Sequence, residues 1–502
     1  MLKNRKINPN RNYYIFNLLV AFVFFLCVAG FMLNSRKTIF SAIQIGTSEH
    51  HELIKSSIWA KDPGLIDKLW NDQPLLHTVI LGFAFRHFGN DVGTARGVAL
   101  VFTLILLVAI FFTTYRHLGA TAGCLSVFAV FAAPHIFQLS ISAMLEVPSF
   151  AIAMVSLMML EIWFRKGKVI WLIASAISFA VSLNIKWTSA IVGPALLCEL
   201  FIMARDREKV GLTGSVPKIL ITWVIVVFFL FLVLTFIIGP KLDSTLESHF
   251  SDGTRNNYIT KIFSLWSVIG FTDLIEGHPE SLLIVCLGIW VALIPGGFRL
   301  VAFPLTWLIS ALVIHSVNRP FWYYYYLHLA IPIGLIASVS ISKFIDGSQN
   351  SQMSRCVRLT NIIKRSLAII TFSFTISIGI FRLSTSIASL QEIPVIENVD
   401  LIKVMRQYAP YTNWIYTRST IFAFHAGMVP PPEIAILPTK RFWSGQIDDD
   451  GIIKVVERYQ PEALLLKIDY DETIVYESSL RDKYRMIYTD KTYQFWMANR
   501  VL

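Results

Sequence analysis

The sequence has few charged side chains and few cysteines for its length. Asp, Glu, Lys and Arg make up 15% of its 502 residues and hydrophobic residues 55%, and the mean hydropathy is +0.58. A soluble protein of this size does not use so much apolar side chain, so the composition indicates a polytopic membrane protein. The five cysteines are widely scattered and lack the spacing of a metal knuckle or a disulfide framework, so we assign them no function.

Other patterns are also missing. No internal repeat or low-complexity tract is present, which weakens the case for a repeat-built transporter. The polar C-terminal part contains no Gly-rich phosphate loop and no nucleophile elbow. The net charge of +11 comes from Lys and Arg in short loops between apolar runs, so it reports membrane topology rather than a nucleic-acid partner.

Apolar segments long enough to cross about 30 Å of hydrocarbon as helices recur from Tyr13 to Ile387. We therefore predict a helical membrane domain over residues 1–389 and an α/β domain over residues 390–502. The first segment, Tyr13 to Leu33, follows several basic residues and lacks a small-residue cleavage site, which favours a retained anchor with a cytoplasmic N-terminus. The expected location is the inner membrane of a bacterium.

About eleven crossings then place every basic turn on the cytoplasmic side. These turns are 115–117, Arg165 to Lys168, Arg205 to Lys209, Arg299 and Arg355 to Arg365. The stretch Leu75 to Phe88 is only about 14 residues long and follows Pro74, so we interpret it as an interfacial helix within a first outer loop that covers residues 34–96. The last crossing, Ser366 to Ile387, delivers the C-terminal domain to the outer face.

The C-terminal domain alternates helical and strand patterns. Helices are predicted at Asn398 to Tyr408 and Gly451 to Tyr459, and strands at Trp414 to Thr417, Glu433 to Leu437, Ala463 to Ile468, Tyr484 to Tyr488 and Tyr493 to Met497.

Two acidic positions fall on the predicted outer face. The stretch Glu49-His50-His51-Glu52 could supply a general base from Glu49 or Glu52. Glu49 and His51 could instead hold a divalent ion, because carboxylate oxygens suit Mg or Mn and imidazole suits Zn. A solvated polar helix is the alternative. Glu146 begins an apolar run, where a carboxylate indicates a function, or favours a helix start through the helix dipole.

Cationic and aromatic side chains lie on the same predicted face. Lys186 interrupts an apolar stretch, and its ammonium group would bind a phosphate or extend to the membrane interface beside Trp187. Arg319 precedes the aromatic run that contains Tyr325; this pair could clamp a phosphate and receive a sugar or prenyl chain, or form only an interfacial girdle. His278 is a further candidate for substrate binding, with a structural role as its alternative.

Several short segments, in this order, resemble the GT-C membrane glycosyltransferases of the protein O-mannosyltransferase and aminoarabinose transferase superfamily. The resemblance covers almost the whole chain, although each segment alone is weakly specific. The segments are Ser48 to His51, Trp70 to Leu76, Phe88-Gly89, Arg96, Leu145 to Pro148, Asn184 to Trp187 and Tyr323 to Tyr326.

The resemblance implies transfer of a sugar from a polyprenyl-phosphate carrier to an acceptor at the outer leaflet. Direct displacement by an acceptor hydroxyl predicts inversion. The acceptor is left open among lipid, glycan and protein. By the same resemblance, Glu49 is the catalytic base or helps to organise a metal, and Glu146 is the second outer acid. Lys186 meets the donor phosphate, and Arg319 and Tyr325 contact the donor. His51 and Glu52 are further candidates for substrate binding.

The sequence departs from the family pattern at two of these positions. The family's first loop usually carries an Asp-Glu pair, whereas Ser48-Glu49 offers one acid, so Glu52 could share the role of base. The second outer acid is often Asp, and Glu146 is one methylene longer. A transporter or flippase of a lipid-linked saccharide is the alternative function, in which the same charges only bind phosphate.

Overall fold

The structure is a computed structural model of the chain. It describes residues 25, 26, 28, 30, 36–211, 215–238, 279–317, 322–345, 355–468 and 481–502. Most of the predicted first crossing, Tyr13 to Leu33, lies outside these residues, as do Arg319 and His278.

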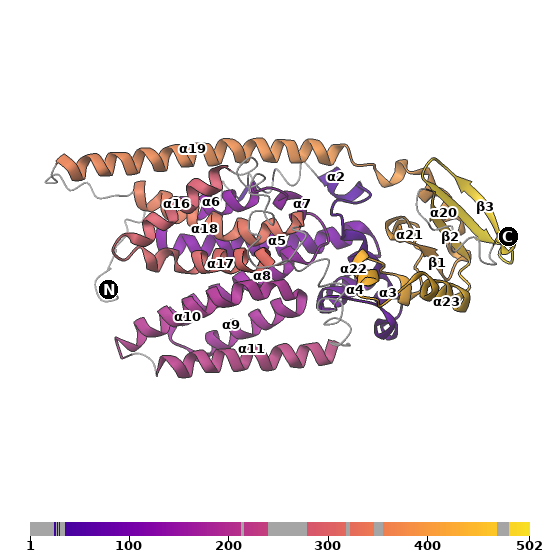
Figure 1. The fold of residues 1–502 in the computed structure, drawn as a ribbon, viewed down its shortest axis with the longest axis horizontal. Helices are drawn as coiled ribbons and strands as arrows, with labels where there is room; N and C mark the ends of the chain where they lie inside the picture. The colour runs from indigo at the N-terminus through magenta and orange to yellow at the C-terminus, as the bar shows by residue number, and fades with distance from the viewer. Residues whose placement is uncertain are drawn as a thin grey trace.

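Long helices lie side by side in a bundle that fills one part of the molecule (Figure 1). Seven helical segments of the described residues are long and apolar enough to cross a membrane. They are α5 (Val92–Leu118), α8 (Glu146–Lys166), η2 with α10 (Trp187–Val192 and Gly193–Glu208), α11 (Val216–Ile238), α17 (Phe298–Val317), η3 with α18 (Tyr323–Tyr325 and Tyr326–Ile345) and α19 (Arg355–Gln391). Shorter apolar helices are α6 (Ala120–Phe131), α9 (Val169–Ile185) and α16 (Pro279–Leu293). The predicted polytopic membrane fold is therefore confirmed, while the count of eleven crossings stays a prediction.

The basic turns meet at one end of the bundle. Arg116 lies 3.5 Å from Glu161, and Arg299 lies 2.5 Å from Glu199. Arg207 donates a hydrogen bond of 2.5 Å to the carbonyl of Phe164. These contacts join basic turns that the charge pattern places on the same side of the membrane. The positions of these turns therefore agree with the predicted alternation of helix directions.

A layer of short helices covers the opposite end of the bundle. It consists of α2 (Arg36–Ser41), α3 (Glu49–Lys61), η1 (Pro63–Lys68) and α4 (Leu76–Phe88). Figure 1 shows α3 and α4 between the bundle and the C-terminal sheet, so the predicted helix over Leu75 to Phe88 lies at the bundle end rather than within it. The two helices pack closely, because a Cβ atom at Gly82 would meet the Trp59 ring at 2.3 Å. Buried apolar side chains such as Leu53 and Phe85 join them to Phe424.

The C-terminal part contains a four-stranded sheet with strand order β1-β2-β4-β3. Strands β1 (Ile415–Thr417) and β2 (Ala463–Lys467) are parallel, whereas β4 (Tyr493–Ala498) is antiparallel to both β2 and β3 (Tyr484–Thr489). The helices of this part are α20 (Asp400–Tyr408), α21 (Thr420–Ala426), α22 (Thr439–Trp443) and α23 (Asp449–Tyr459). Four of the five predicted strands and both predicted helices are thus confirmed.

The predicted strand over Glu433 to Leu437 is wrong. The chain there forms a short 3-10 helix, η6 (Pro432–Ile434), followed by an irregular stretch. The prolines on either side lack a backbone N–H donor, which disfavours the backbone hydrogen bonds of a β-sheet. The Arg441 side chain also binds the carbonyls of Glu433 and Ile436, at 2.7 and 3.0 Å, where strand partners would otherwise be needed.

Backbone contacts dock the C-terminal part on the first outer loop. Ala42 forms an isolated antiparallel bridge with Val395, and the Ile43 amide donates to the Pro394 carbonyl at 2.9 Å. His425 of α21 donates through Nε2 to the Ile43 carbonyl at 2.7 Å. The loop that leads into α3 is consequently held by residues about 350 positions later in the chain.

Candidate active site

The first predicted acid, Glu49, forms a bidentate ion pair with Arg96 of α5. Arg96 Nε lies 2.9 Å from Glu49 Oε1, and the Nη2 atom lies 2.8 Å from Oε2. The backbone amides of Ile45 and Ala143 donate to the same two oxygens, at 2.8 and 3.1 Å. Both charged side chains are completely buried. Glu49 therefore joins the first outer loop, α5 and the segment before α8.

The ion pair with Arg96 favours the ionised form of the Glu49 carboxyl group. Burial raises the pKa of its carboxyl, but the charge and hydrogen bonds of Arg96 and the two amides outweigh burial, so the pKa is lowered. Each oxygen already accepts two hydrogen bonds. A substrate hydroxyl could reach Glu49 only if a donor left, so this geometry favours a positioning role. The role of Glu49 as base stays a prediction that these contacts do not support.

The second predicted acid, Glu146, lies close by. It begins α8 three residues after Ala143 and forms a short ion pair with Lys186, which follows α9 directly. The ammonium group also lies 4.7 Å from the Tyr324 ring centroid and 6.0 Å from that of Tyr325. Among the described residues, the other Glu146 oxygen, Oε2, is buried without a hydrogen-bond partner. The structure thus brings Glu146, Lys186 and Tyr325 together, as the sequence analysis expects.

Glu52 belongs to a separate buried network. Lys55 lies 2.6 Å from Oε1, His77 lies 3.3 Å from Oε2, and Lys55 also donates to Asn71 at 2.9 Å. Burial raises the pKa of Glu52, but the charge of Lys55 and the hydrogen bond and charge of His77 outweigh burial and lower it to about 2. Glu52 therefore stays ionised and engaged at neutral pH. His51 lies beside this network, with its ring 4.0 Å from that of His50.

Two imidazoles of α3 are held neutral. Burial lowers the pKa of His50 to about 4 and the pKa of His51 well below its usual value, with like charges contributing at His51. The unfolded chain binds more protons at these positions below pH 6.5, so the free energy of unfolding falls as the pH drops from 7 towards 4. The loss should be on the order of 1 kcal/mol per imidazole.

Thermal unfolding of the solubilised protein at pH 7.5 and pH 5.0 measures this effect. The melting temperature should be lower at pH 5.0, and the variant with His50→Gln and His51→Gln should show a smaller difference between the two pH values. An equal difference in both proteins would assign the pH dependence to other groups.

The segment 70–73 connects three parts of the site. Trp70 donates through Nε1 to Gln446 of the C-terminal part at 2.6 Å. Asp72 forms an ion pair of 3.0 Å with Lys440 of α22. Gln73 accepts a hydrogen bond of 3.3 Å from the backbone amide of Trp187, next to Lys186. Sequence reasoning missed Lys440, because nothing near it in the sequence indicates a partner 368 positions earlier.

Sequence reasoning also missed a pair of buried histidines. His315 Nε2 lies 3.0 Å from His328 Nδ1, and the two rings lie 4.8 and 5.2 Å from that of Tyr325. Within the described part of the chain, the other ring nitrogen of His328 has no hydrogen-bond partner. The Tyr325 ring is therefore close both to Lys186 and to this pair. Two histidines flanking the tyrosine run were the signal available in the sequence.

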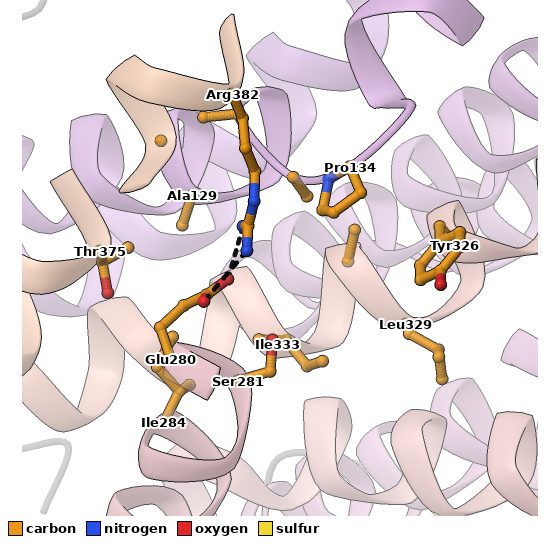
Figure 2. Close-up of a pocket in the computed structure, with 14 residues that line it drawn as sticks. Ala129, Pro134, Glu280, Ser281, Ile284, Tyr326, Leu329, Ile333, Thr375 and Arg382 are labelled. Carbon is orange, nitrogen blue, oxygen red and sulfur yellow. Dashed lines mark hydrogen bonds and ion pairs between the residues drawn. The ribbon is translucent and has the colours of Figure 1, made fainter. Parts of the chain in front are cut away.

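An apolar cavity adjoins the same end of the bundle. It is lined by α6, α16, α18 and α19, and Tyr326, the residue after η3, lies at one side of it (Figure 2). Arg382 of α19 points to Glu280 of α16 there, with contacts of 2.5 and 3.1 Å. Small side chains such as Ala129, Ala330 and Gly379 form much of the remaining wall.

Comparisons with known proteins agree with this architecture. The family model for "Dolichyl-phosphate-mannose-protein mannosyltransferase" matches residues 72–235. The structure is similar to that of ArnT from Cupriavidus metallidurans bound to undecaprenyl phosphate, with a TM-score of 0.59 and 13% identity over 93% of this chain and 97% of that chain. The chain has the GT-C fold.

Other GT-C structures support the same fold. ArnT from Cupriavidus metallidurans in the apo state gives a TM-score of 0.60, at 13% identity over 93% of this chain and 97% of that chain. The archaeal oligosaccharyltransferase AglB from Archaeoglobus fulgidus, in complex with an inhibitory peptide and a dolichol-phosphate, gives 0.51 at 11% identity, over 97% of this chain and 75% of that chain. No curated protein sequence matches the chain. The segment that matches the family model contains Asp72, Glu146 and Lys186, whereas Glu49 precedes it.

A metal ion at Glu49 and His51 is not supported by the geometry. Both Glu49 oxygens are already bound by Arg96 and backbone amides. Where the structure describes the chain, no group of three or more His, Cys, Asp or Glu side chains could hold a metal ion.

Proposed function

We propose that this GT-C protein transfers a sugar from a polyprenyl-phosphate carrier to an acceptor hydroxyl at the outer leaflet, with inversion at the anomeric carbon. The observation that carries the proposal is the buried Glu146–Lys186 pair, which lies under Tyr324 and Tyr325 and leaves one carboxylate oxygen without a partner among the described residues. A buried ion pair at the end of a membrane bundle indicates a function for its members.

Lys186 is the proposed contact for the donor phosphate. Its charge is neutralised by Glu146 in the structure, and a bound phosphate would replace the carboxylate as the anionic partner. The faces of Tyr324 and Tyr325, which already pack on the ammonium group, provide a surface for the sugar ring.

Glu146 is then the proposed base. When Lys186 turns to the phosphate, the carboxylate is released to accept the proton of the acceptor hydroxyl. The hydroxyl oxygen forms a bond to the anomeric carbon, and the bond from that carbon to the phosphate oxygen breaks with its electron pair. The products are the glycosylated acceptor and a polyprenyl phosphate. In this proposal Glu49 positions the segment that carries Glu146, through its bond to Ala143.

The apolar cavity beside Tyr326 is the proposed site for the prenyl chain. It adjoins the tyrosine run that contacts Lys186, and most of its lining is apolar and small. A prenyl chain could enter it from the lipid while its phosphate stays at the polar end.

The test is transfer by the purified protein in liposomes supplied with undecaprenyl phosphate that carries radiolabelled mannose or aminoarabinose. Release of free undecaprenyl phosphate, dependent on an added lipid, glycan or peptide acceptor, is the expected result. Lys186→Met should reduce donor affinity by about tenfold or more, because the phosphate loses its charged partner. Movement of label across the membrane without any release would favour a transporter instead.

A further inference from the structure

The C-terminal part inserts a lysine into the polar end of the bundle. Lys440 of α22 lies 3.0 Å from Asp72, and only 11% of its side chain is exposed. The next residue fixes the position of α22, because Arg441 binds two backbone carbonyls of its own part and stacks on Trp70 at 5.5 Å. Lys440 is thus directed at the site by a docked helix rather than by a free loop.

The same short segment links Lys440 to Lys186. Asp72 binds Lys440, and the adjacent Gln73 binds the backbone of Trp187, which follows Lys186 directly. Burial lowers the pKa of Lys440, Asp72 raises it, and the nearby charge of Lys186 lowers it further. Two ammonium groups therefore share one polar region, and each is paired with a carboxylate.

Two largely buried cations are more than one phosphodiester requires. Moving an ammonium group out of water is costly, and a pair with Asp72 would form as well on the surface. The proposed reaction, however, changes the charge of the phosphate. The donor is a phosphodiester with one negative charge, and cleavage of the bond to the anomeric carbon leaves a phosphomonoester with two. The second charge appears during the reaction, where a second cation is most effective.

We propose that Lys440 binds the leaving polyprenyl phosphate and stabilises the charge that it gains during transfer, so that the C-terminal part completes the active site. This inference rests on the proposed function. Lys186 holds the phosphate in donor and product, whereas Lys440 leaves Asp72 for the phosphate as the second charge develops. In this proposal the C-terminal part contributes a cationic side chain to the active site, in addition to packing over the end of the bundle.

The first measurement compares binding of two ligands, undecaprenyl phosphate and undecaprenyl phosphoryl-mannose. The wild-type protein should bind the monoester more tightly than the diester. Lys440→Met should weaken binding of the monoester by about tenfold and leave the diester within about threefold, and Lys440→Arg should restore much of the difference. Lys403→Met is the matched control, since Lys403 is an exposed lysine of the same part, paired with Asp400.

A second variant separates this role from a structural one. Asp72→Asn removes the competitor for Lys440, so it should leave monoester binding unchanged or tighter, whereas a purely structural ion pair would make both substitutions equally harmful. In a transferring protein, Lys440→Met should lower kcat by about 10- to 100-fold with little change in donor KM. Unchanged monoester affinity in Lys440→Met would overturn the inference. Absence of transfer by the wild type would overturn the proposed function, while the binding comparison would still decide the role of Lys440.

Discussion

Glu146→Gln is expected to lower the rate of sugar transfer by a factor of about 10² to 10⁴, the usual contribution of a positioned general base. Glutamine keeps the size of the side chain and can still accept a hydrogen bond from Lys186, but it cannot take the proton of the acceptor hydroxyl. Because the substitution also removes the carboxylate that competes for Lys186, donor affinity should be retained or increased. Single-turnover rates and donor binding in liposomes measure both effects.

Glu146→Asp is the control for this substitution. It keeps the charge and withdraws the carboxylate by one methylene, so part of the activity should remain. A Glu146→Gln protein that transfers sugar at more than about a tenth of the wild-type rate would exclude Glu146 as the base. Glu52, which lies at the same end of the bundle, would then be the next candidate for the base.

The polytopic helical fold was predictable from the sequence because its determinants are local. Span lengths and basic turns depend on stretches of about 20 residues, and bilayer thickness applies the same constraint to each. The alternation that predicted β2, β3 and β4 is local as well. The strand expected over Glu433 to Leu437 failed because a side chain outside the segment, Arg441, binds its carbonyls.

The candidate site was predictable only in part. Glu146 and Lys186 were found because a charged residue in an apolar run is conspicuous wherever its partner lies. The partner itself is a matter of tertiary structure. Arg96 was identified only as one of the segments that carry the family resemblance, and its pairing with Glu49, 47 positions earlier, favours an anchoring role for that acid over the role of base. Lys440 and the histidine pair have no local signature of this kind.

Breaking the Glu49–Arg96 pair is expected to have the largest effect on stability. Arg96→Met leaves a buried carboxylate without its cation, and loss of one partner of a buried pair typically costs about 3 to 5 kcal/mol. The guanidinium group also donates to the carbonyls of Ile39 and Ala42, at 2.6 and 2.8 Å, so the first outer loop loses two further contacts. The melting temperature of the solubilised protein should fall sharply, and transfer should fall with the folded fraction.

The matched experiment distinguishes an anchor from a base. The double variant Glu49→Leu with Arg96→Met replaces both charges by apolar groups and should recover part of the stability lost in Arg96→Met, because no isolated charge stays buried. If Glu49 acts only as an anchor, the folded double variant should retain some transfer, since Glu146 and Lys186 are untouched. Glu49→Gln keeps an oxygen that can accept from the Ala143 amide, so a Glu49→Gln protein that folds normally, binds donor and shows no transfer would instead establish Glu49 as a participant in the reaction.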